Sequence, residues 1–144
     1  MQTKNTHCNA LPLTQSYYQG RTDIPLIEKT IGQYLDNIVD NYPNHPAIVV
    51  HHQQIRLTYR QYQQQINQLA MGLLSLGVKP GDRVGIWSPN NIEWCLTQFA
   101  TAKIGAIMVC INPAYRPSEL KYALNSVECS TLITASEFKA SNYI

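Results

Sequence analysis

The chain has 144 residues, of which 44% are hydrophobic and only 14% are charged, and its formal net charge is +2. This is one domain's worth of chain, and it is long enough to bury a core. So small a charge argues against a nucleic-acid partner or an anionic membrane surface. No apolar run approaches the roughly 20 residues of a membrane span, and the first residues carry no secretion or import signal. We therefore expect a cytoplasmic protein.

The four cysteines are isolated from one another in the sequence. They are Cys8, Cys95, Cys110 and Cys129, and none forms a C-x-x-C pair. Cys95 and Cys110 fall within apolar core patterns. We expect free thiols in a reducing compartment instead of a disulfide or metal framework.

Residues 1–29 show no hydrophobic period, and we interpret them as an extended leader. A capping box of Thr30 and Gln33 then opens a short helix that Pro43 ends. The helix is expected to bury one apolar stripe, made by Ile31, Tyr34, Leu35, Ile38, Val39 and Tyr42.

A hairpin and a long helix follow. Residues 47–50 and 55–57 are short apolar segments separated by a turn at residues 51–54. Thr58 caps the helix, Gln61 occupies the reciprocal position, and Gly77 ends it. Its expected core face consists of Tyr62, Ile66, Leu69, Ala70, Leu73 and Leu74.

Residues 82–115 are expected to form a strand, a helix and a second strand, which is one βαβ unit. The first strand runs from Arg83 to Ser88, and Asn90 caps the helix, with Glu93 in capping-box position. Gly105 ends the helix, and residues 106–111 form a strand covered on both faces. The expected helical stripe consists of Ile92, Cys95, Leu96, Phe99 and Ala102.

The C-terminal part repeats the alternation of helix and strand. A helix starts at Pro117 or Ser118, a strand spans residues 129–134, and Ser136 is a candidate cap for one more helix. The inward residues of the first of these helices are Leu120, Ala123, Leu124 and Val127. The pattern predicts an α/β fold, with a mostly parallel sheet, covering helices and a preceding hairpin. Because this sheet is unfinished, its open edge should promote association.

Two candidate sites have simpler structural interpretations. His51 and His52 resemble a metal pair, but adjacent residues on a strand point to opposite faces, and a turn explains them better. Gly77, Gly81 and Gly85 lack G-x-G-x-x-G spacing and precede a strand, so a helix end, a turn and a small strand residue account for them.

Catalytic groups are missing from the sequence pattern. Glu93, Glu119 and Glu128 are separate helix-surface carboxylates without a visible partner, which argues against an acid–base pair. There is no Gly/Ser/Thr-rich phosphate loop, Walker lysine, catalytic triad or acidic cluster for magnesium.

A fourth candidate site lies where two strands end. Ser88–Asn91 and Asn112–Tyr115 follow strands that are expected to be neighbours, and ligands of parallel sheets bind at the carboxyl ends of strands. The asparagines and Tyr115 would line such a pocket. Helix capping and strand exit explain the same residues without a ligand, and the sequence leaves both interpretations open.

Several blocks of the sequence together resemble a known family. They are LTYRQYQ at residues 57–63, AKIGAIMVCINP at residues 102–113, and the flanking PLIEKTIGQYLD, PNNIEW and INPAYRPSELKYAL. Over residues 16–144 the chain resembles the N-terminal part of the AMP-forming acyl-CoA synthetases, an adenylate-forming family, and particularly their medium-chain branch. The resemblance implies two units, a leader over 1–29 and an incomplete N-terminal α/β subdomain over 30–144.

The resemblance also implies a reaction for the parent enzyme. A fatty acid, of medium or long chain, attacks the α-phosphate of ATP to give acyl-adenylate and pyrophosphate, and coenzyme A then displaces AMP. The family uses ATP, magnesium and coenzyme A, and its phosphate loop, nucleotide motifs, hinge and lysine lie later in sequence than Ile144. No catalytic, cofactor-binding or metal residue is therefore carried over to this chain.

The resemblance leaves three interpretations of this 144-residue sequence: a fragment of a synthetase, a truncated gene product, or half of a split protein. We expect the isolated chain to be inactive and to bind no cofactor. The alternatives are a non-catalytic scaffold that needs a partner carrying the phosphate loop, and a free-standing ligand-binding domain that uses the two strand-end loops.

Overall fold

A computed structural model describes residues 20–138 and 141–142 of the chain. Its helices are α1 (Ile31–Asn41), α2 (Tyr59–Ser75), α3 (Ile92–Ile104) and α4 (Pro117–Ser126), with a short 3₁₀ turn, η1 (His51–Gln53). Its strands are β1 (Pro46–Val50), β2 (Ile55–Thr58), β3 (Arg83–Trp87), β4 (Ile107–Ile111), β5 (Thr131–Thr134), β6 (Glu137–Phe138) and β7 (Ser141–Asn142). Residues 1–19 of the expected leader, with Cys8, lie outside the described residues, and residues 20–30 contain no helix or strand.

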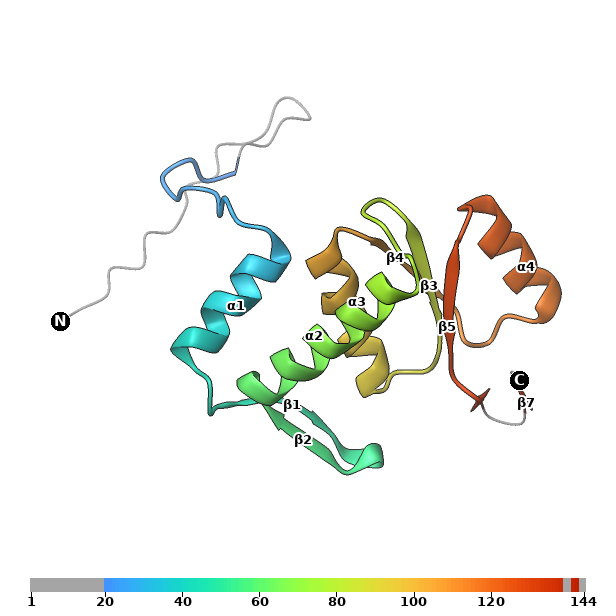
Figure 1. Cartoon of the computed structure of the whole chain (residues 1–144), viewed down its shortest axis with the longest axis horizontal. Helices are drawn as coiled ribbons and strands as arrows, with labels where there is room; N and C mark the ends of the chain where they lie inside the picture. Colours follow the sequence, from blue (N-terminus) through green and yellow to red (C-terminus); the bar gives the residue numbers. More distant parts are fainter. Residues whose placement is uncertain (1–19, 139–140, 143–144) are drawn as a thin grey trace, which may run out of the picture.

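Three parallel strands form the central sheet, in the order β4-β3-β5. Helices α2 and α3 lie on one side of this sheet and α4 lies on the other (Figure 1). The β3-α3-β4 segment is the predicted βαβ unit, and the α/β fold with its parallel sheet is confirmed. No helix among the residues that the structure describes is long and apolar enough to cross a membrane.

The strand β4 differs from its prediction. It lies at one edge of the sheet, and among the described strands only β3 pairs with it. Ile107 is 52% exposed and Cys110 is exposed as well, whereas Ile111 is buried. The expectation of a strand covered on both faces was therefore wrong, because a continuous apolar run does not reveal whether neighbouring elements cover it.

The hairpin and the first two helices begin as the sequence predicts. Strands β1 and β2 pair antiparallel, and Gln54 closes the turn with a left-handed backbone, φ 55°. The Thr58 hydroxyl accepts from the Gln61 amide nitrogen at 3.3 Å, and the Gln61 side chain accepts from the Thr58 amide nitrogen at 2.9 Å. Thr30 and Gln33 make the same reciprocal pair before α1. Both capping boxes are confirmed.

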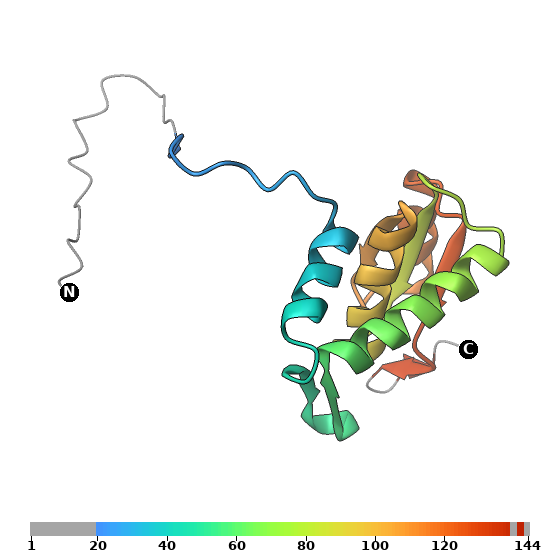
Figure 2. The ribbon, with the colours of Figure 1, turned by 60° about the vertical axis from the view of Figure 1, so that its left-hand side comes forward.

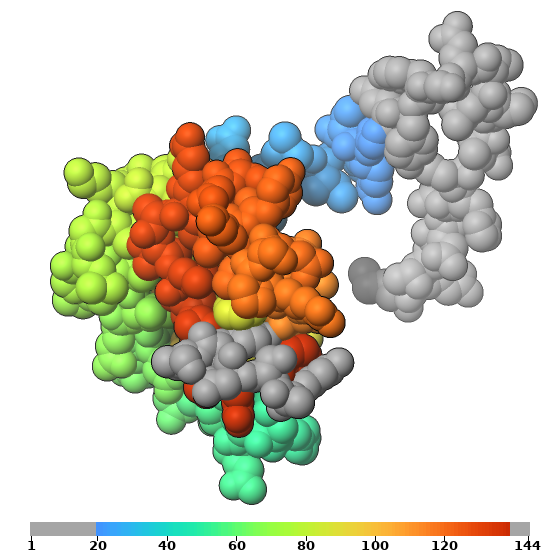
Figure 3. Space-filling model, turned by 90° about the vertical axis from the view of Figure 1, so that its right-hand side faces the viewer, coloured from blue at the N-terminus to red at the C-terminus, as the bar shows by residue number. Residues whose placement is uncertain are grey.

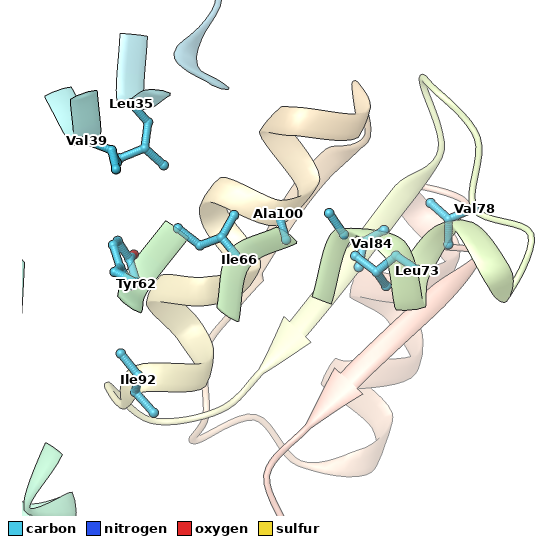
Figure 4. Close-up of a cluster of buried hydrophobic side chains, with 10 residues drawn as sticks. Leu35, Val39, Tyr62, Ile66, Leu73, Val78, Val84, Ile92 and Ala100 are labelled. Atoms are coloured by element: carbon cyan, nitrogen blue, oxygen red, sulfur yellow. The ribbon is translucent and has the colours of Figure 1, made fainter. Parts of the chain in front are cut away.

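The main core lies between α1, α2, α3 and the sheet, as Figures 2 and 4 show. Its buried residues are Leu35, Val39, Tyr62, Ile66, Ala70, Leu73, Val78, Val84, Ile92 and Ala100. Ile66 and Val84 are fully buried. Leu74, which the sequence also assigns to the α2 core face, is 50% exposed, because α2 packs along a narrower stripe than the pattern implied.

The helix α3 is buried on more than one side. It contacts α2 and α1 as well as β3 and β4, so its fully buried positions include Thr97, Ala100 and Thr101. The two threonine hydroxyls donate to backbone carbonyls one turn earlier, at 2.7 and 2.8 Å, and are thereby satisfied. The predicted apolar stripe of α3 packs against the core only in part, because the prediction supposed that neighbouring elements cover a single face of this helix.

The helix α1 buries less than predicted. Leu35 and Val39 are buried, but Ile31, Tyr34 and Tyr42 are 62%, 45% and 49% exposed. Gly32 is also buried in this contact, and a Cβ added to it would lie 3.0 Å from Lys103 Cγ. Helix α1 therefore contacts the rest of the protein along a narrow strip of its surface and leaves part of its apolar face exposed to solvent.

The C-terminal elements also depart from the sequence pattern. Ser136 does not cap a helix, because β6 follows directly and pairs with β7 in an antiparallel arrangement. Helix α4 begins at Pro117 after an Arg116 cap, and its expected inward residues are half-buried. No residue of α4 is fully buried, since it lies on the outside of the molecule next to β5 (Figure 3).

Candidate ligand site at the carboxyl ends of the strands

The two strand-end loops lie beside each other, as the sequence predicts. Trp87 at the end of β3 pairs in register with Ile111 at the end of β4. The Trp87 indole nitrogen donates to the Asn112 carbonyl at 3.1 Å and so links the two loops. Whether a ligand binds there is a separate question, which depends on what the side chains in each loop already contact.

The loop after β3 uses its polar side chains to begin α3. Asn91, and not Asn90, caps this helix, because its Oδ1 accepts from the Trp94 amide nitrogen at 2.9 Å. Its Nδ2 donates to the hydroxyl of Ser88 at 2.8 Å, and that hydroxyl donates to the Pro89 carbonyl at 3.1 Å. Ser88 is only 5% exposed. The predicted cap was therefore wrong by one residue, and Asn90 is exposed without a capping role.

A second cap for α3 comes from the hairpin. The Gln53 side chain accepts from the Ile92 amide nitrogen at 2.7 Å and donates to the Glu93 carboxylate at 2.9 Å. These bonds hold the tip of the hairpin against the loop after β3. This role of Gln53 could not be predicted from the sequence, because nothing in its neighbouring residues distinguishes it from the many other glutamines of this chain.

Replacing Gln53 with alanine is expected to lower the free energy of unfolding by about 1–2 kcal/mol, through loss of a helix cap and one side-chain hydrogen bond. Denaturant unfolding measures the change, and hydrogen exchange should show faster exchange of the Ile92 amide. His52→Ala, an exposed neighbour, is the matched control and should change stability by less than about 0.5 kcal/mol. Equal effects of both variants would show that Gln53 does not act as a cap.

The loop after β4 is a local turn. The Asn112 side-chain oxygen accepts a hydrogen bond from the Ala114 amide nitrogen at 2.9 Å. The backbone carbonyl of Asn112 accepts one from the Tyr115 amide nitrogen at 3.0 Å. Tyr115 is 37% exposed and borders a cavity of about 380 Å³ together with Tyr122 of α4. The asparagine therefore shapes the loop, whereas the tyrosine faces accessible space.

A second cavity, of about 330 Å³, lies at the ends of β3 and β5. Its polar lining includes Gln53, Ser88, Asn91, Glu93 and Thr134. A carboxylate, amides and hydroxyls surround this space, and among the described residues no positively charged side chain lines it. The structure thus has a cavity at the ends of β3 and β5, whereas the sequence predicted a pocket at the ends of β3 and β4.

The glutamates expected to lack partners have them. Glu93 accepts from Gln53, Glu119 accepts from the Arg116 amide nitrogen at 2.8 Å, and Glu128 pairs with Arg83 at 2.8 Å. The partners of Glu93 and Glu128 come from distant parts of the chain, so the sequence pattern did not reveal them. Glu128 also lies beyond α4 with a left-handed φ of 50°, and not on a helix surface. All three carboxylates therefore have structural roles.

The histidines and glycines occupy turns and a strand, as their structural interpretation predicts. His51 and His52 lie exposed in η1, and among residues 20–138 and 141–142 no group of three His, Cys, Asp or Glu could hold a metal ion. Gly77 and Gly81 have φ of +90° and +87°. Gly85 is buried in β3, where an added Cβ would lie 3.0 Å from the Cys129 sulfur.

Two groups with shifted pKa values lie away from these loops, the buried Tyr62 phenol and the half-buried Cys95 thiol. Burial raises the pKa of the Tyr62 phenol, whose hydroxyl donates to the Cys95 carbonyl at 2.8 Å. Burial also raises the pKa of the Cys95 thiol. Both groups are therefore neutral at ordinary pH, and Cys95 is not an activated thiolate. Cys95, Cys110 and Cys129 are free, and Cys110 is exposed where the sequence pattern placed it in the core.

Comparison with known proteins identifies the class to which this fold belongs. Residues 35–143 match the family model of the AMP-binding enzymes. This match covers more than half of the chain, so the chain belongs to the AMP-binding enzyme family. The resemblance found in the sequence is thereby confirmed.

Particular relatives are acyl-CoA ligases. The medium-chain acyl-CoA ligase ACSF2, mitochondrial, of Rattus norvegicus is 44% identical over 136 residues, which are 94% of this chain and 22% of that protein. The putative acyl-CoA synthetase YngI of Bacillus subtilis (strain 168) is 41% identical over 118 residues, 82% of this chain and 22% of that protein. The chain thus spans about a fifth of the length of these relatives.

Solved structures of adenylate-forming enzymes have the same fold. A Mycobacterium tuberculosis fatty acyl CoA synthetase aligns with a TM-score of 0.71 at 31% identity, over 73% of this chain and 21% of that one. The N-terminal subdomain of Klebsiella oxytoca NpsA aligns with a TM-score of 0.70 at 26% identity, over 77% of this chain and 29% of that one. The described fold therefore matches N-terminal subdomains of this class.

Proposed function

We propose that these residues are part of an AMP-forming fatty acyl-CoA ligase, which converts a fatty acid, ATP and coenzyme A into acyl-CoA, AMP and pyrophosphate through an acyl-adenylate. The observation that carries the proposal is 44% identity to a medium-chain acyl-CoA ligase across nearly the whole chain. The structural match to a fatty acyl CoA synthetase supports it. The proposed substrate of the whole enzyme is a fatty acid of medium or long chain.

Within such an enzyme, these residues act as a scaffold. The parallel sheet and its capped helices fix the strand-end loops, and the polar groups of those loops are largely engaged with one another. We assign no step of the ATP chemistry to these residues.

The isolated chain is expected to show no ATP–pyrophosphate exchange above a no-protein control, with decanoate as the acyl substrate. A longer protein containing these residues together with a phosphate loop is expected to show exchange and acyl-CoA formation under the same conditions. Exchange by the 144-residue chain alone would contradict the scaffold role. Absence of ligation by the longer protein would contradict the ligase assignment.

An alternative is a chain that works only with a partner polypeptide carrying the phosphate loop. The outer edge of β4, which pairs with no other strand in the part of the chain that the structure describes, and the exposed Ile107 would give such a partner a surface. Mixing the chain with a second polypeptide that begins at the phosphate loop should then restore ligation. The open edge of the parallel sheet should also make the isolated chain associate with itself. Light scattering that shows a stable monomer at high concentration would contradict this expectation.

A free-standing ligand-binding domain is the remaining candidate, favoured by the exposed Tyr115 beside its cavity. Saturable binding of ATP, AMP or an acyl ligand that is lost in Tyr115→Phe would support this function. Asn112→Ala provides a second test, but it also removes the turn that Asn112 holds.

The cellular location remains a prediction. We propose a cytoplasmic protein, because isolated cysteines suit a reducing compartment, whereas the ACSF2 relatives carry the word mitochondrial in their names. Fractionation of the source cells with an antibody against this segment distinguishes the two compartments. A signal confined to mitochondria would show that the cytoplasmic assignment is wrong.

A further inference from the structure

We draw no further inference here: the strongest candidate, the outer edge of β4 with its uncharged residues Ile107–Ile111, carries nothing further, because nothing in the part of the chain that the structure describes shows what covers this edge.

Discussion

Replacement of Ile66 by alanine is expected to lower the free energy of unfolding by about 2–5 kcal/mol. Ile66 lies in the middle of α2, is fully buried, and belongs to the cluster that joins α1, α2, α3 and the sheet (Figure 4). The truncation removes buried methyl groups and leaves a cavity that close-packed neighbours fill only in part. Urea denaturation followed by circular dichroism measures the loss.

The control for Ile66 is Leu74→Ala, two turns further along the same helix. Leu74 is 50% exposed, so this change should alter stability by less than about 0.5 kcal/mol. Both residues belong to the predicted core face of α2, but neighbouring elements bury only Ile66 completely. A loss at Leu74 as large as that at Ile66 would mean that α2 packs along a different face.

Replacement of Lys103 by methionine is expected to cost about 1–2 kcal/mol, because it breaks the polar contact that joins three helices. The Lys103 ammonium donates to Asp36 at 2.6 Å and to Asn67 at 3.0 Å, and the Gln63 amide also donates to Asp36 at 2.6 Å. The Lys103 side chain is only 15% exposed, whereas that of Asp36 is 45% exposed and partly screened by solvent. A double-mutant cycle with Asp36→Asn isolates the coupling between the two residues.

The same contact predicts a pH dependence. Burial acts to raise the pKa of Asp36, but the hydrogen bonds from Lys103 and Gln63 outweigh it and hold this pKa below its ordinary value of 3.8. The carboxylate therefore stabilises the fold above that value, and the contribution is lost as the pH falls through the lower pKa of the folded state. The stability difference between the wild type and Asp36→Asn should shrink over this acidic range. A difference that stays constant there would contradict the ion pair.

Arg83→Gln is the matched control for Lys103. Arg83 also forms an ion pair, with Glu128, but the Glu128 side chain is 83% exposed. Solvent screens such a pair, so we expect a smaller loss than for Lys103→Met, even though Arg83 also donates to the Val127 carbonyl at 2.8 Å. An equal or larger loss would show that burial does not distinguish the two pairs.

Local sequence signals were sufficient for the order and the ends of most elements. Thr30 and Thr58 start their helices with capping boxes, and Gly105 ends α3 with a left-handed φ of 73°. These interactions involve residues a few positions apart, so they can be recognised in a linear pattern. The same kind of signal failed at Ser136, where pairing of β6 with β7 replaces a helix.

The candidate site could be located from the sequence only in outline. The sequence placed the loops after β3 and β4 side by side, because parallel strands bring their carboxyl ends to one edge. It could not find Gln53, which lies 39 residues from its partner Ile92, nor show that β5 completes the polar cavity of about 330 Å³. Such partners depend on how the hairpin and the third strand dock.

Residue order was enough to predict the family, the alternation of strands and helices, and the caps that begin α1 and α2, because the caps depend on contacts within one helical turn. The tertiary structure alone decided which side of each helix is covered. It left Leu74 and Ile31 in solvent, buried Thr97 and Thr101, and brought Lys103 to Asp36 across 67 residues. The physical reason is that a hydrophobic pattern records which side chains favour burial, whereas burial itself requires a neighbouring surface, and only the docking of distant segments supplies one.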